Sequence, residues 1–481
     1  MECEYLSNPH WWFSKDSTTD EYISNKYSHL LDDKFIDDKS LEYILRYDQL
    51  PRHVYRNESA NHIIQYFLQK ALKHFEHIEP YLDQLDDTRF VFALLPLRHT
   101  YEPEQIYKAL RLCWSRKTIG TIITRFIKAA YNRCPIVGLG PQSVLEDNFD
   151  RSILAFCPDV NSFQNNSLKG MNTMVKFQKK DIILSISGGV DSMVCSYLLR
   201  DKIKACVHIN YSNRTTSDEE AKFVKWWCKQ LNVPCYVRKI HEIKRSQCKQ
   251  IGIRDVYEEY TRKVRFKCYE QMGENALIVL GHNKDDVLEN IFTNISKMCK
   301  FDNLNGMEKE SCNNGINFWR PLLDVTKNDI IQFAKDNAIP FLPNSTPSWS
   351  QRGQIRASIV PTIQAWDSNF ISSVYKLSHV MQDMHQYIHQ SCTTIIQNAI
   401  YHDNKNQHIE LNLTDIPNII LFWKMLFTGL GIYGISSKSL QNALIHLLKN
   451  ANKKKTIVLK HDTYFTIEPT CLHYKLNIYQ N

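Results

Sequence analysis

The chain has 481 residues, of which 43% are hydrophobic and 11% aromatic, so it can bury real cores and is not a disordered chain. A length of this order predicts two or three domains. The net charge of +8 permits a polyanionic partner such as RNA but does not require one, because a solvated surface with extra lysines explains it equally well.

Cysteine usage and the absence of targeting patterns indicate a reduced compartment inside the cell. The 14 cysteines contain no Cys-x-x-Cys pair, which argues against a zinc ribbon or an iron–sulfur clip. The first residues, MECEYLSNPHWWFSK, lack the basic start and apolar run of a signal peptide. The most apolar run, Ile419 to Ile435, contains Lys424 and three glycines and is short for a membrane span. We therefore expect a cytoplasmic protein with no membrane segment, and a buried helix followed by a turn at this run.

Residues 1–157 have the pattern of an all-α domain. In NHIIQYFLQKALKHF, apolar residues such as Ile63, Phe67 and Leu68 recur at helical spacing, and EQIYKALRLCW repeats the pattern. Residues 158–176 are polar and rich in Asn and Ser, which is typical of a linker. Because the linker separates this helical section from the rest of the chain, we expect residues 1–157 to fold as an independent domain.

Residues 177–361 have the pattern of an α/β domain. Short apolar runs such as DIILSIS, KACVHIN and ALIVLGH alternate with helical patterns, which predicts a parallel sheet covered on both faces. Ligands bind such sheets beyond the carboxyl ends of the strands, so SGGVDS and GHNKDD are expected to face one crevice. Residues 362–481 are helical and end in strand patterns. The predicted fold is thus a parallel-sheet α/β core, preceded by an all-α domain and followed by a smaller α+β region.

The segment SGGVDS, Ser187 to Ser192, is a strand–turn–helix loop suited to holding phosphate. Its two glycines let the backbone approach closely, and the helix after it offers free N–H groups and the positive end of its dipole. Asp191 would repel phosphate unless a cation lay between them, so a magnesium ion at Asp191 is implied. No Gly-Lys-Ser/Thr comes after the loop, which excludes the loop of kinases and small GTPases. The simpler interpretation is a glycine turn before a helix cap.

Charged residues on two predicted helices are further candidates. Asp286 and Glu289 are three residues apart and share a helix face after GH at a strand end. Such carboxylates can help to deprotonate an amine, although acidic residues also favour helix N-termini on electrostatic grounds alone. Arg262 and Arg265 follow Glu258 by four and seven residues, on one face. A guanidinium suits phosphate there, and a surface ion pair is the simpler alternative.

The hexapeptide SGGVDS matches the PP-loop of the ATP-pyrophosphatase superfamily. Between about Asp181 and Pro361, and more loosely to the C-terminus, the chain resembles the tRNA(Ile)-lysidine synthases in INYSNR, VYEEYTRKVRFKCY, GHNKDDVLENIFTNI, LNGM, FWRPLLDVTKNDIIQFAKDNAIPF and QRGQIRASIVP. The resemblance implies a tRNA-modifying ligase that adenylates the C2 oxygen of the wobble cytidine in a CAU-anticodon tRNA(Ile) with ATP. Free lysine then displaces AMP, which gives lysidine; pyrophosphate is the other product.

The same resemblance implies roles for individual residues, with ATP and magnesium as cofactors. Asp286 and Glu289 would hold the amino groups of lysine. The arginines would face the adenylate or the tRNA backbone, and Arg352 and Arg356 invite the same interpretation. His282 is more often a packing or capping residue than a base. The implied ATP-binding residues are Ser187, Gly188, Gly189, Val190, Asp191, Ser192 and His282. The implied catalytic residues are Asp191, Asp286, Glu289, Arg262 and Arg265, with the metal at Asp191.

The sequence departs from the synthase family at several positions. Tyr211 stands where the family has His, and Gly353 stands where it has Asn. Asn290 replaces the usual Thr, and FLPNSTPS lacks the acidic residues of the family's Asp-Pro-Ser-Asn stretch. These departures concern the substrate more than the use of ATP, because the phosphate loop is intact.

The segments NPHWWFSKD, LRYDQLPRHVYRN and RFVFALLPLRHTYEPEQ resemble an uncharacterised bacterial helical family with a tetratricopeptide-like fold. This resemblance implies a fold and no activity. Its charged positions can form a buried polar network, which we favour, or a pocket. The matching positions are Trp12, Phe13, Asp48, Gln49, Pro51, Arg52, Arg56, Pro96 and His99.

Two other functions are weighed against the ligase. A tRNA thiolase of the same superfamily commonly needs a persulfide cysteine or a Cys-x-x-Cys pair, and no such pair occurs. An RNA-binding scaffold with an inactive ATP site would not be expected to keep Asp191 and Ser192. The run Lys453-Lys454-Lys455 either touches tRNA phosphates or is a solvated turn. The sequence does not fix the oligomeric state, and a homodimer is one option.

Overall fold

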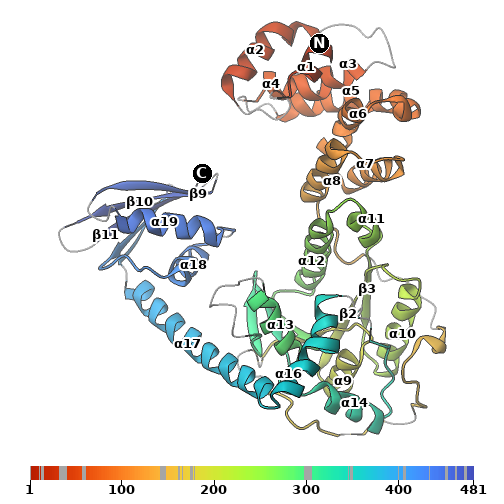
Figure 1. The fold of residues 1–481 in the computed structure, drawn as a ribbon. Helices are drawn as coiled ribbons and strands as arrows, with labels where there is room; N and C mark the ends of the chain where they lie inside the picture. Colours follow the sequence, from red (N-terminus) through yellow and green to blue (C-terminus); the bar gives the residue numbers. More distant parts are fainter. Residues whose placement is uncertain are drawn as a thin grey trace. The chain divides into compact units, whose positions relative to one another are not determined.

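Figure 1 shows the fold in a computed structural model of the chain. Trp12 and Phe13, which match the bacterial helical family, lie outside the residues that the structure describes. Those residues are 2–9, 11, 16–31, 41–56, 61–140, 148–160, 163–164, 166–173, 177, 179–296, 306–344, 346, 350–398, 400–404, 408–432, 434–449, 453–460, 463–470 and 474–480.

The chain begins with a helical section, as the apolar spacing predicts. In α5 (Asn61–Ile78) the residues Phe67, Ala71 and Phe75 are buried at helical spacing. Every regular element described before residue 134 is helical, which confirms the all-α prediction for this section. The other α-helices are α1 (Glu2–Ser7), α2 (Ser17–Tyr27), α3 (Leu41–Ile44), α4 (Leu50–Val54), α6 (Asp87–His99), α7 (Pro103–Ser115) and α8 (Thr121–Arg133), and a π-helical turn, Leu45–Gln49, joins α3 to α4.

A six-stranded sheet comes next, with the strand order β3-β2-β1-β4-β6-β5. Its strands pair in parallel except β5, which is antiparallel to β6 at one edge. The parallel α/β prediction is therefore confirmed. The strands are β1 (Asp181–Ser185), β2 (Ile203–Asn210), β3 (Cys235–Lys239), β4 (Ala276–Leu280), β5 (Glu310–Asn313) and β6 (Ile316–Trp319).

Helices cover both faces of this sheet because successive strand residues point in opposite directions. In β1, Ile183 packs with α11 (Arg245–Gln250), α12 (Arg254–Glu270) and the N-terminal helices. Its neighbours Ile182 and Leu184 pack on the other face, with α9 (Val190–Leu199), α10 (Ser217–Gln230) and α14 (Lys327–Asp336). The two faces thus belong to two separate hydrophobic clusters.

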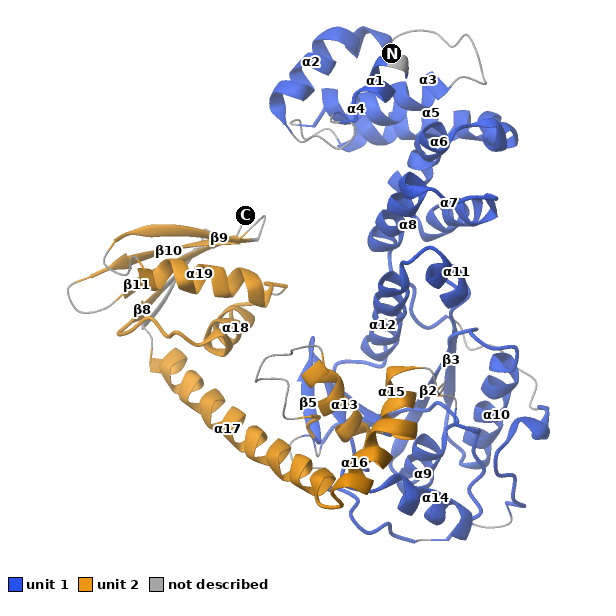
Figure 2. Ribbon diagram, in the orientation of Figure 1, with its two compact units in different colours: residues 1–281, 309–344 blue, residues 282–308, 345–481 orange. Residues whose placement is uncertain are grey.

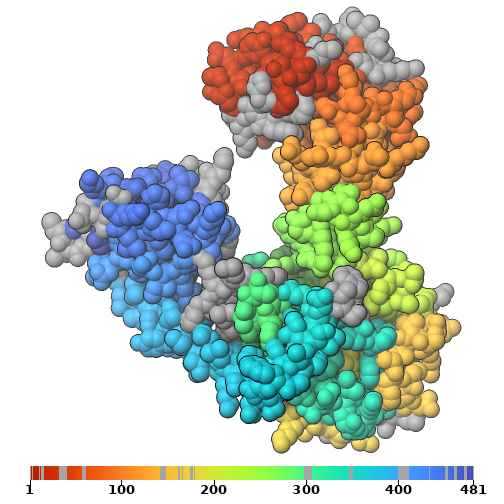
Figure 3. Space-filling model, viewed as in Figure 1, coloured from red at the N-terminus to blue at the C-terminus, as the bar shows by residue number. Residues whose placement is uncertain are grey.

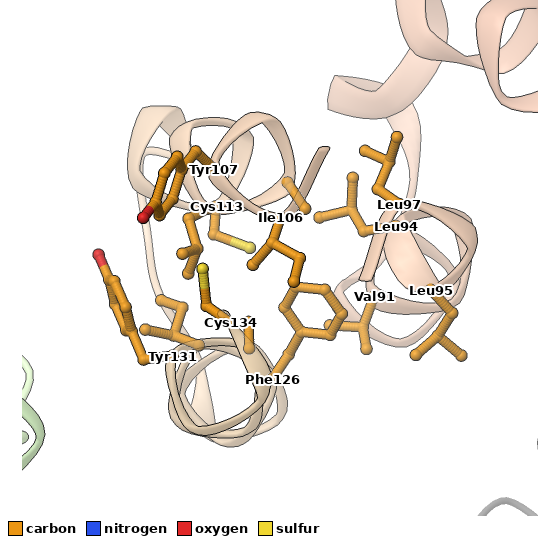
Figure 4. Packing of buried hydrophobic residues seen from close by; sticks show 14 of the residues in the cluster. Val91, Leu94, Leu95, Leu97, Ile106, Tyr107, Cys113, Phe126, Tyr131 and Cys134 are labelled. Carbon is orange, nitrogen blue, oxygen red and sulfur yellow. The ribbon is translucent and has the colours of Figure 1, made fainter. Parts of the chain in front are cut away.

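The N-terminal helices pack directly against the sheet's helical layer. The Tyr107 hydroxyl of α7 lies 2.8 Å from the Tyr260 hydroxyl of α12, and the rings of Tyr131 and Tyr260 lie 5.3 Å apart, edge to face. Tyr107 and Tyr131 sit together at one edge of the apolar cluster of this section (Figure 4). The space-filling view shows orange atoms of α7 and α8 meeting the green atoms of α11 and α12 (Figure 3).

The C-terminal part is the smaller α+β region that the sequence predicts. Its five-stranded sheet is antiparallel throughout, in the order β7-β8-β11-β10-β9. The elements after α14 are α15 (Gln351–Gln354), a π-helical turn (Ile355–Ile359), α16 (Val360–Trp366), α17 (Phe370–Asn398), β7 (Ile400–Asn404), β8 (His408–Leu413), α18 (Ile420–Gly429), α19 (Ser437–Lys449), β9 (Lys455–Lys460), β10 (Thr463–Pro469) and β11 (Tyr474–Gln480).

The apolar run at Ile419 to Ile435 is a buried helix and a turn, as expected. α18 buries Phe422, Trp423 and Phe427, and the chain turns at Gly431, which has φ +74°. Within the described part of the chain, none of the helices has the length and apolar character needed to span a membrane.

By its internal contacts the chain divides into two compact units (Figure 2). The first comprises residues 1–281 and 309–344, and the second comprises residues 282–308 and 345–481. This division groups the N-terminal helices with the sheet, and it places α13 (Lys284–Ser296) with the C-terminal elements. The boundaries at residues 157, 176 and 361 stay predictions.

Candidate active site

The glycine-rich loop of the first unit lies between a central strand and a helix. β1 ends at Ser185, and α9 begins at Val190. Gly188 has φ +84°, a left-handed conformation that favours glycine, and its carbonyl accepts a hydrogen bond from the Leu342 N–H at 2.9 Å. A Cβ at Gly188 would lie 2.5 Å from Cδ1 of Leu342, so an added side chain would have to displace this leucine.

Hydroxyl groups brace this loop from inside. Ser192 Oγ accepts a hydrogen bond from the Ser187 N–H at 3.1 Å and donates one to the Gly189 carbonyl at 2.9 Å. The first helical hydrogen bond of α9 runs from the Met193 N–H to the same carbonyl at 3.1 Å. The N–H groups of the first turn precede that bond, so they are the donors that a helix offers to an anion.

The end of β4 closes one side of the loop. A Cβ at Gly281, the residue after the strand, would lie 2.9 Å from the backbone nitrogen of Ser192. Because Gly281 has no side chain, the end of β4 can come into direct contact with the start of α9. The expectation that SGGVDS and GHNKDD meet at one edge is confirmed for Gly281, whereas His282 and the residues after it belong to the second unit.

Asp191 is held by a cation from a neighbouring helix. Lys327, the first residue of α14, donates a hydrogen bond from Nζ to Asp191 Oδ2 at 2.6 Å, and both side chains are partly buried. Among the described residues no group of three or more His, Cys, Asp and Glu side chains is placed to hold a metal ion. A cation at Asp191 would therefore need phosphate oxygens or water as its remaining ligands. The loop itself fits a phosphate group, because it offers helix-start N–H donors and a glycine, Gly188, whose positive φ shapes the turn.

In the second unit, Asp286 and Glu289 converge on one arginine. The Arg356 guanidinium donates from Nη2 to Asp286 Oδ1 at 3.2 Å and from Nε to Glu289 Oε1. Arg356 lies in the π-helical turn Ile355–Ile359, a type of irregularity often found at functional sites. Asn283 caps α13, since its Oδ1 accepts from the Asp285 N–H at 2.9 Å. The helix face shared by the two carboxylates is thus as predicted.

Glu289 is the buried member of this cluster. Its side chain is only 2% exposed, and burial raises the pKa of its carboxyl group against the lowering effect of Arg356. Its Oε2 atom is buried without a hydrogen-bond partner among the described residues, and Arg352 Nε lies 3.9 Å from it. A buried acceptor that lacks a donor is costly, so this oxygen marks a place where a ligand's N–H group would be stabilised.

Comparison with known proteins covers the residues of both sites. A family model for the PP-loop domain matches residues 161–363, which include the glycine-rich loop. The chain contains a PP-loop domain. A second family model, for bacterial proteins of unknown function (DUF924), matches residues 3–122.

Several curated proteins named tRNA(Ile)-lysidine synthase are similar to this chain. One from Staphylococcus aureus (strain MRSA252) is 25% identical over 278 residues, which cover 54% of this chain and 63% of the relative. Another, from Malacoplasma penetrans, is 27% identical over 201 residues, 41% of this chain and 66% of the relative. The chain thus spans less than two thirds of their length. Among solved structures, the U34-tRNA thiolase NcsA from Methanococcus maripaludis is 15% identical with a TM-score of 0.35, covering 44% of this chain and 76% of that one.

The helix α12 of the PP-loop unit carries the predicted arginine pair. Arg262 is exposed with its guanidinium over the Phe266 ring at 5.4 Å, and Arg265 is half-buried. Glu258 pairs with Arg254 at 2.8 Å rather than with either arginine. The surface ion pair that we considered for this face therefore does not involve Arg262 or Arg265, and their role stays a prediction.

The positions at which the sequence departs from the synthases have structural roles. Asn290 donates from Nδ2 to the Gly306 carbonyl at 3.0 Å, which ties α13 to the LNGM segment. The Gly353 N–H donates to Ser350 Oγ at 3.0 Å as part of a helix cap, and Tyr211 packs at the margin of the hydrophobic cluster. Of FLPNSTPS, residues 345 and 347–348 lie outside the described residues.

Sequence reasoning missed three residues of these sites. Lys327 follows Leu-Leu-Asp-Val-Thr, and no sequence motif marks this lysine as part of a site. Its partner, Asp191, lies far away in the sequence. Tyr375 is partly buried and donates to the Lys284 carbonyl at 2.9 Å, while the Lys284 ammonium lies 4.8 Å from its ring centroid. Asn283 was overlooked as the cap of α13, although Asn before Asp-Asp at a helix start is a cap signal.

The charged positions that match the bacterial helical family form a buried network, as favoured from the sequence. His99 Nδ1 lies 2.9 Å from both carboxylate oxygens of Asp48, and Arg52 donates to Asp48 at 3.1 Å. Arg98 Nη2 contacts the other ring nitrogen of His99 at 3.3 Å. His99 therefore donates from Nδ1 and accepts at Nε2, and burial lowers its pKa to about 4. Arg56 pairs with Asp20 at 2.9 Å instead.

Proposed function

We propose that this chain is an ATP-dependent tRNA(Ile)-lysidine synthetase. It would adenylate the C2 oxygen of the wobble cytidine in a CAU-anticodon tRNA(Ile) and join free lysine at that carbon. The observation that carries the proposal is the PP-loop between β1 and α9, with its glycine at positive φ and its open helix start. Support for the substrates comes from the names of the curated relatives and from the buried carboxylates of α13.

The first chemical step uses the PP-loop. Backbone N–H groups at the start of α9 bind phosphate oxygens of ATP, and Lys327 supplies a further positive charge beside Asp191. A magnesium ion held by Asp191 and phosphate would offset charge on the leaving pyrophosphate. The cytidine C2 oxygen attacks the α-phosphorus, the bond to the β-phosphate oxygen breaks, and pyrophosphate leaves.

The second step uses the carboxylates of α13. A protonated lysine amine is not nucleophilic, so a base must accept a proton before attack on C2. Glu289, with its raised pKa and its Oε2 without a donor, is the proposed acceptor, and Asp286 and Glu289 together hold the lysine ammonium groups. The amine nitrogen bonds to C2, the C2–oxygen bond breaks, and AMP leaves with that oxygen.

Mass spectrometry of tRNA nucleosides tests this proposal. Purified protein, CAU-anticodon tRNA, ATP and lysine should yield lysidine together with AMP and pyrophosphate, and omission of lysine should prevent lysidine formation. Release of ADP and phosphate would contradict the proposed cleavage of ATP between its α- and β-phosphates. A thiolated nucleoside would show that the enzyme is a tRNA thiolase and not a ligase. The cysteines favour the ligase: among the cysteines whose side chains the structure describes, only Cys157 and Cys312 are exposed.

A further inference from the structure

The charge of this chain is concentrated in one helical hairpin. Residues 105–145, which include most of α7 and all of α8, contain seven of the 59 basic residues and none of the 51 acidic ones. The remainder of the chain is close to electrical balance. A single-sign segment of this length on a folded surface creates a local positive field rather than a general solubilising charge.

Two of these seven charges are neutralised by neighbours. Lys108 pairs with Glu79 at 2.6 Å, and Arg116 pairs with Asp87 at 3.1 Å. The other basic side chains make no ion pair with any residue that the structure describes, and they are exposed apart from the half-buried Lys128. They are Arg111, Lys117, Arg125, Lys128 and Arg133.

Three of the unneutralised residues lie along the outer side of α8. The opposite side of this helix is buried, through Ile123, Phe126, Ile127, Ala130 and Tyr131. Arg125, Lys128 and Arg133, here called the basic face of α8, span about 12 Å along the helix axis at 1.5 Å per residue. Arginine forks suit phosphate oxygens, and a row of such charges suits a nucleic-acid backbone.

The basic face belongs to the same compact unit as the PP-loop. α8 is fixed to α12 through Tyr131 and Tyr260, and α12 carries Arg262 and Arg265. All of these helices pack on one side of the sheet. A polyanion that reaches Arg262 on α12 is therefore on the same side of the unit as the basic face.

We propose that the basic face of α8 binds the phosphate backbone of tRNA and helps to hold the substrate on the PP-loop unit. This inference rests on the proposed function for the identity of the RNA. An anionic membrane is a poorer fit, because surface-binding helices insert apolar side chains, and those of α8 are used in the protein's core.

The test compares two triple variants of the full chain. Arg125→Gln/Lys128→Gln/Arg133→Gln removes the basic face, and Lys222→Gln/Lys225→Gln/Lys229→Gln removes the same charge from α10 on the opposite face of the sheet. Binding of a CAU-anticodon tRNA transcript is measured by fluorescence anisotropy at several salt concentrations. The α8 variant should bind about ten-fold or more weakly, with a salt slope flatter by about 2, as expected for two or three lost phosphate contacts. The α10 variant should stay within about two-fold of the native chain.

Further measurements separate the possible failures. Thermal melting checks that both variants are folded, and Arg125→Lys/Arg133→Lys, which keeps the charge, should retain most of the affinity. If the α8 and α10 variants lose the same amount of tRNA affinity, or if neither loses any, the basic face of α8 is not a tRNA-binding surface. The proposed function would still stand in that case if lysidine still forms. If the native chain forms no lysidine but its RNA binding depends on the basic face, the proposed function fails and the RNA surface stands. If the basic face binds anionic vesicles in preference to tRNA, its ligand is a membrane surface and not RNA.

Discussion

Lys327 Nζ lies 2.6 Å from the Asp191 carboxylate, so the first residue of α14 neutralises the acidic residue of the PP-loop. This pair explains how a carboxylate can stand in the first turn of a helix that we propose to bind phosphates. The lysine balances the carboxylate in the ligand-free protein and lies next to the place where phosphate charge would arrive.

Replacement of Asp191 by Asn should abolish ATP-dependent AMP release while leaving the fold intact, because the loop is built from backbone contacts and serine hydroxyls. Replacement of Lys327 by Gln should raise the apparent ATP constant about 10- to 100-fold, since hydrogen bonds to charged groups contribute about 1.5–3 kcal/mol. Steady-state AMP release over a range of ATP concentrations measures both. Lys309→Gln is the matched control, because Lys309 forms a more exposed ion pair with Asp324 in the same unit. An equal effect in that control would remove the specific role of Lys327.

Replacement of Glu289 by Gln should weaken the use of lysine more than that of ATP. Its carboxylate is buried beside Arg356, and its second oxygen is the acceptor proposed for a lysine ammonium. Loss of the charge should raise the apparent lysine constant at least about ten-fold, given about 1.5–3 kcal/mol for a charge-assisted hydrogen bond. The apparent constants for lysine and ATP are measured on the same variant. A parallel rise in both constants would count against lysine binding at α13.

Two neighbouring glycines of the PP-loop should respond differently to an added methyl group. Gly188→Ala must adopt positive φ, at a cost of about 1–2 kcal/mol, and its Cβ would also press on Leu342. A Cβ at Gly189, where φ is −70°, would meet Ser187 Oγ at 3.5 Å, an ordinary contact. Calorimetry should therefore show a lower melting temperature for Gly188→Ala than for Gly189→Ala. Similar melting temperatures would show that the turn rearranges.

Acidification should destabilise the N-terminal helices through His99. The pKa of His99 is about 4 in the folded state, below its ordinary value of 6.5, because the buried ring is kept neutral. As the pH falls, the unfolded chain therefore binds a proton at this histidine before the folded chain does. The contribution of neutral His99 to the free energy of unfolding is complete above pH 6.5 and is lost as the pH falls towards 4. The free energy of unfolding changes by at most about 1.4 kcal/mol per pH unit through this group. The pKa of Asp48 is also lowered, by its His99 and Arg52 partners, so its contribution is lost at still lower pH.

Unfolding by denaturant between pH 4 and 7 measures this slope, followed by circular dichroism at fixed ionic strength. His99→Gln keeps a donor for Asp48 but does not titrate, so its free energy of unfolding should depend less on pH in that range. His53, whose pKa burial also lowers, is unchanged in the variant and serves as the internal background. An unchanged slope would assign the acid sensitivity to other groups.

A chain that begins near Gly170 should keep lysine-dependent AMP release at saturating tRNA, because the PP-loop, the carboxylates of α13 and the arginines of α12 all lie beyond that point. Its affinity for tRNA should be lower, since it lacks the basic face. Its solubility is the critical control, because removal of Tyr107 and Tyr131 uncovers Tyr260 on α12. A soluble, folded chain that is inactive at every tRNA concentration would place part of the active site in the N-terminal helices.

Sequence patterns predicted the elements whose signals are local. The PP-loop, the parallel sheet and the helix face shared by Asp286 and Glu289 all derive from short-range spacing. Asp191 pairs with Lys327, and Arg356 pairs with both carboxylates of α13. These residues lie far apart in the chain, so the local periodicity of the sequence cannot predict their pairing. The packing of α8 on α12 could not be predicted from the sequence for the same reason. The polar linker predicts a domain boundary, yet apolar residues on both sides of it belong to one cluster.

That shared cluster has a consequence for synthesis on the ribosome. α7 and α8 emerge well before α12, so Tyr131 lacks its contact with Tyr260 until about 130 more residues have been translated. At about 5–20 residues per second this interval lasts roughly 6–26 seconds. During that time the nascent helices present an uncovered aromatic patch beside a strongly basic surface, and both can attract chaperones or ribosomal RNA. Synonymous codons that slow translation between residues 134 and 260 would lengthen this exposure without altering a single side chain of the finished protein.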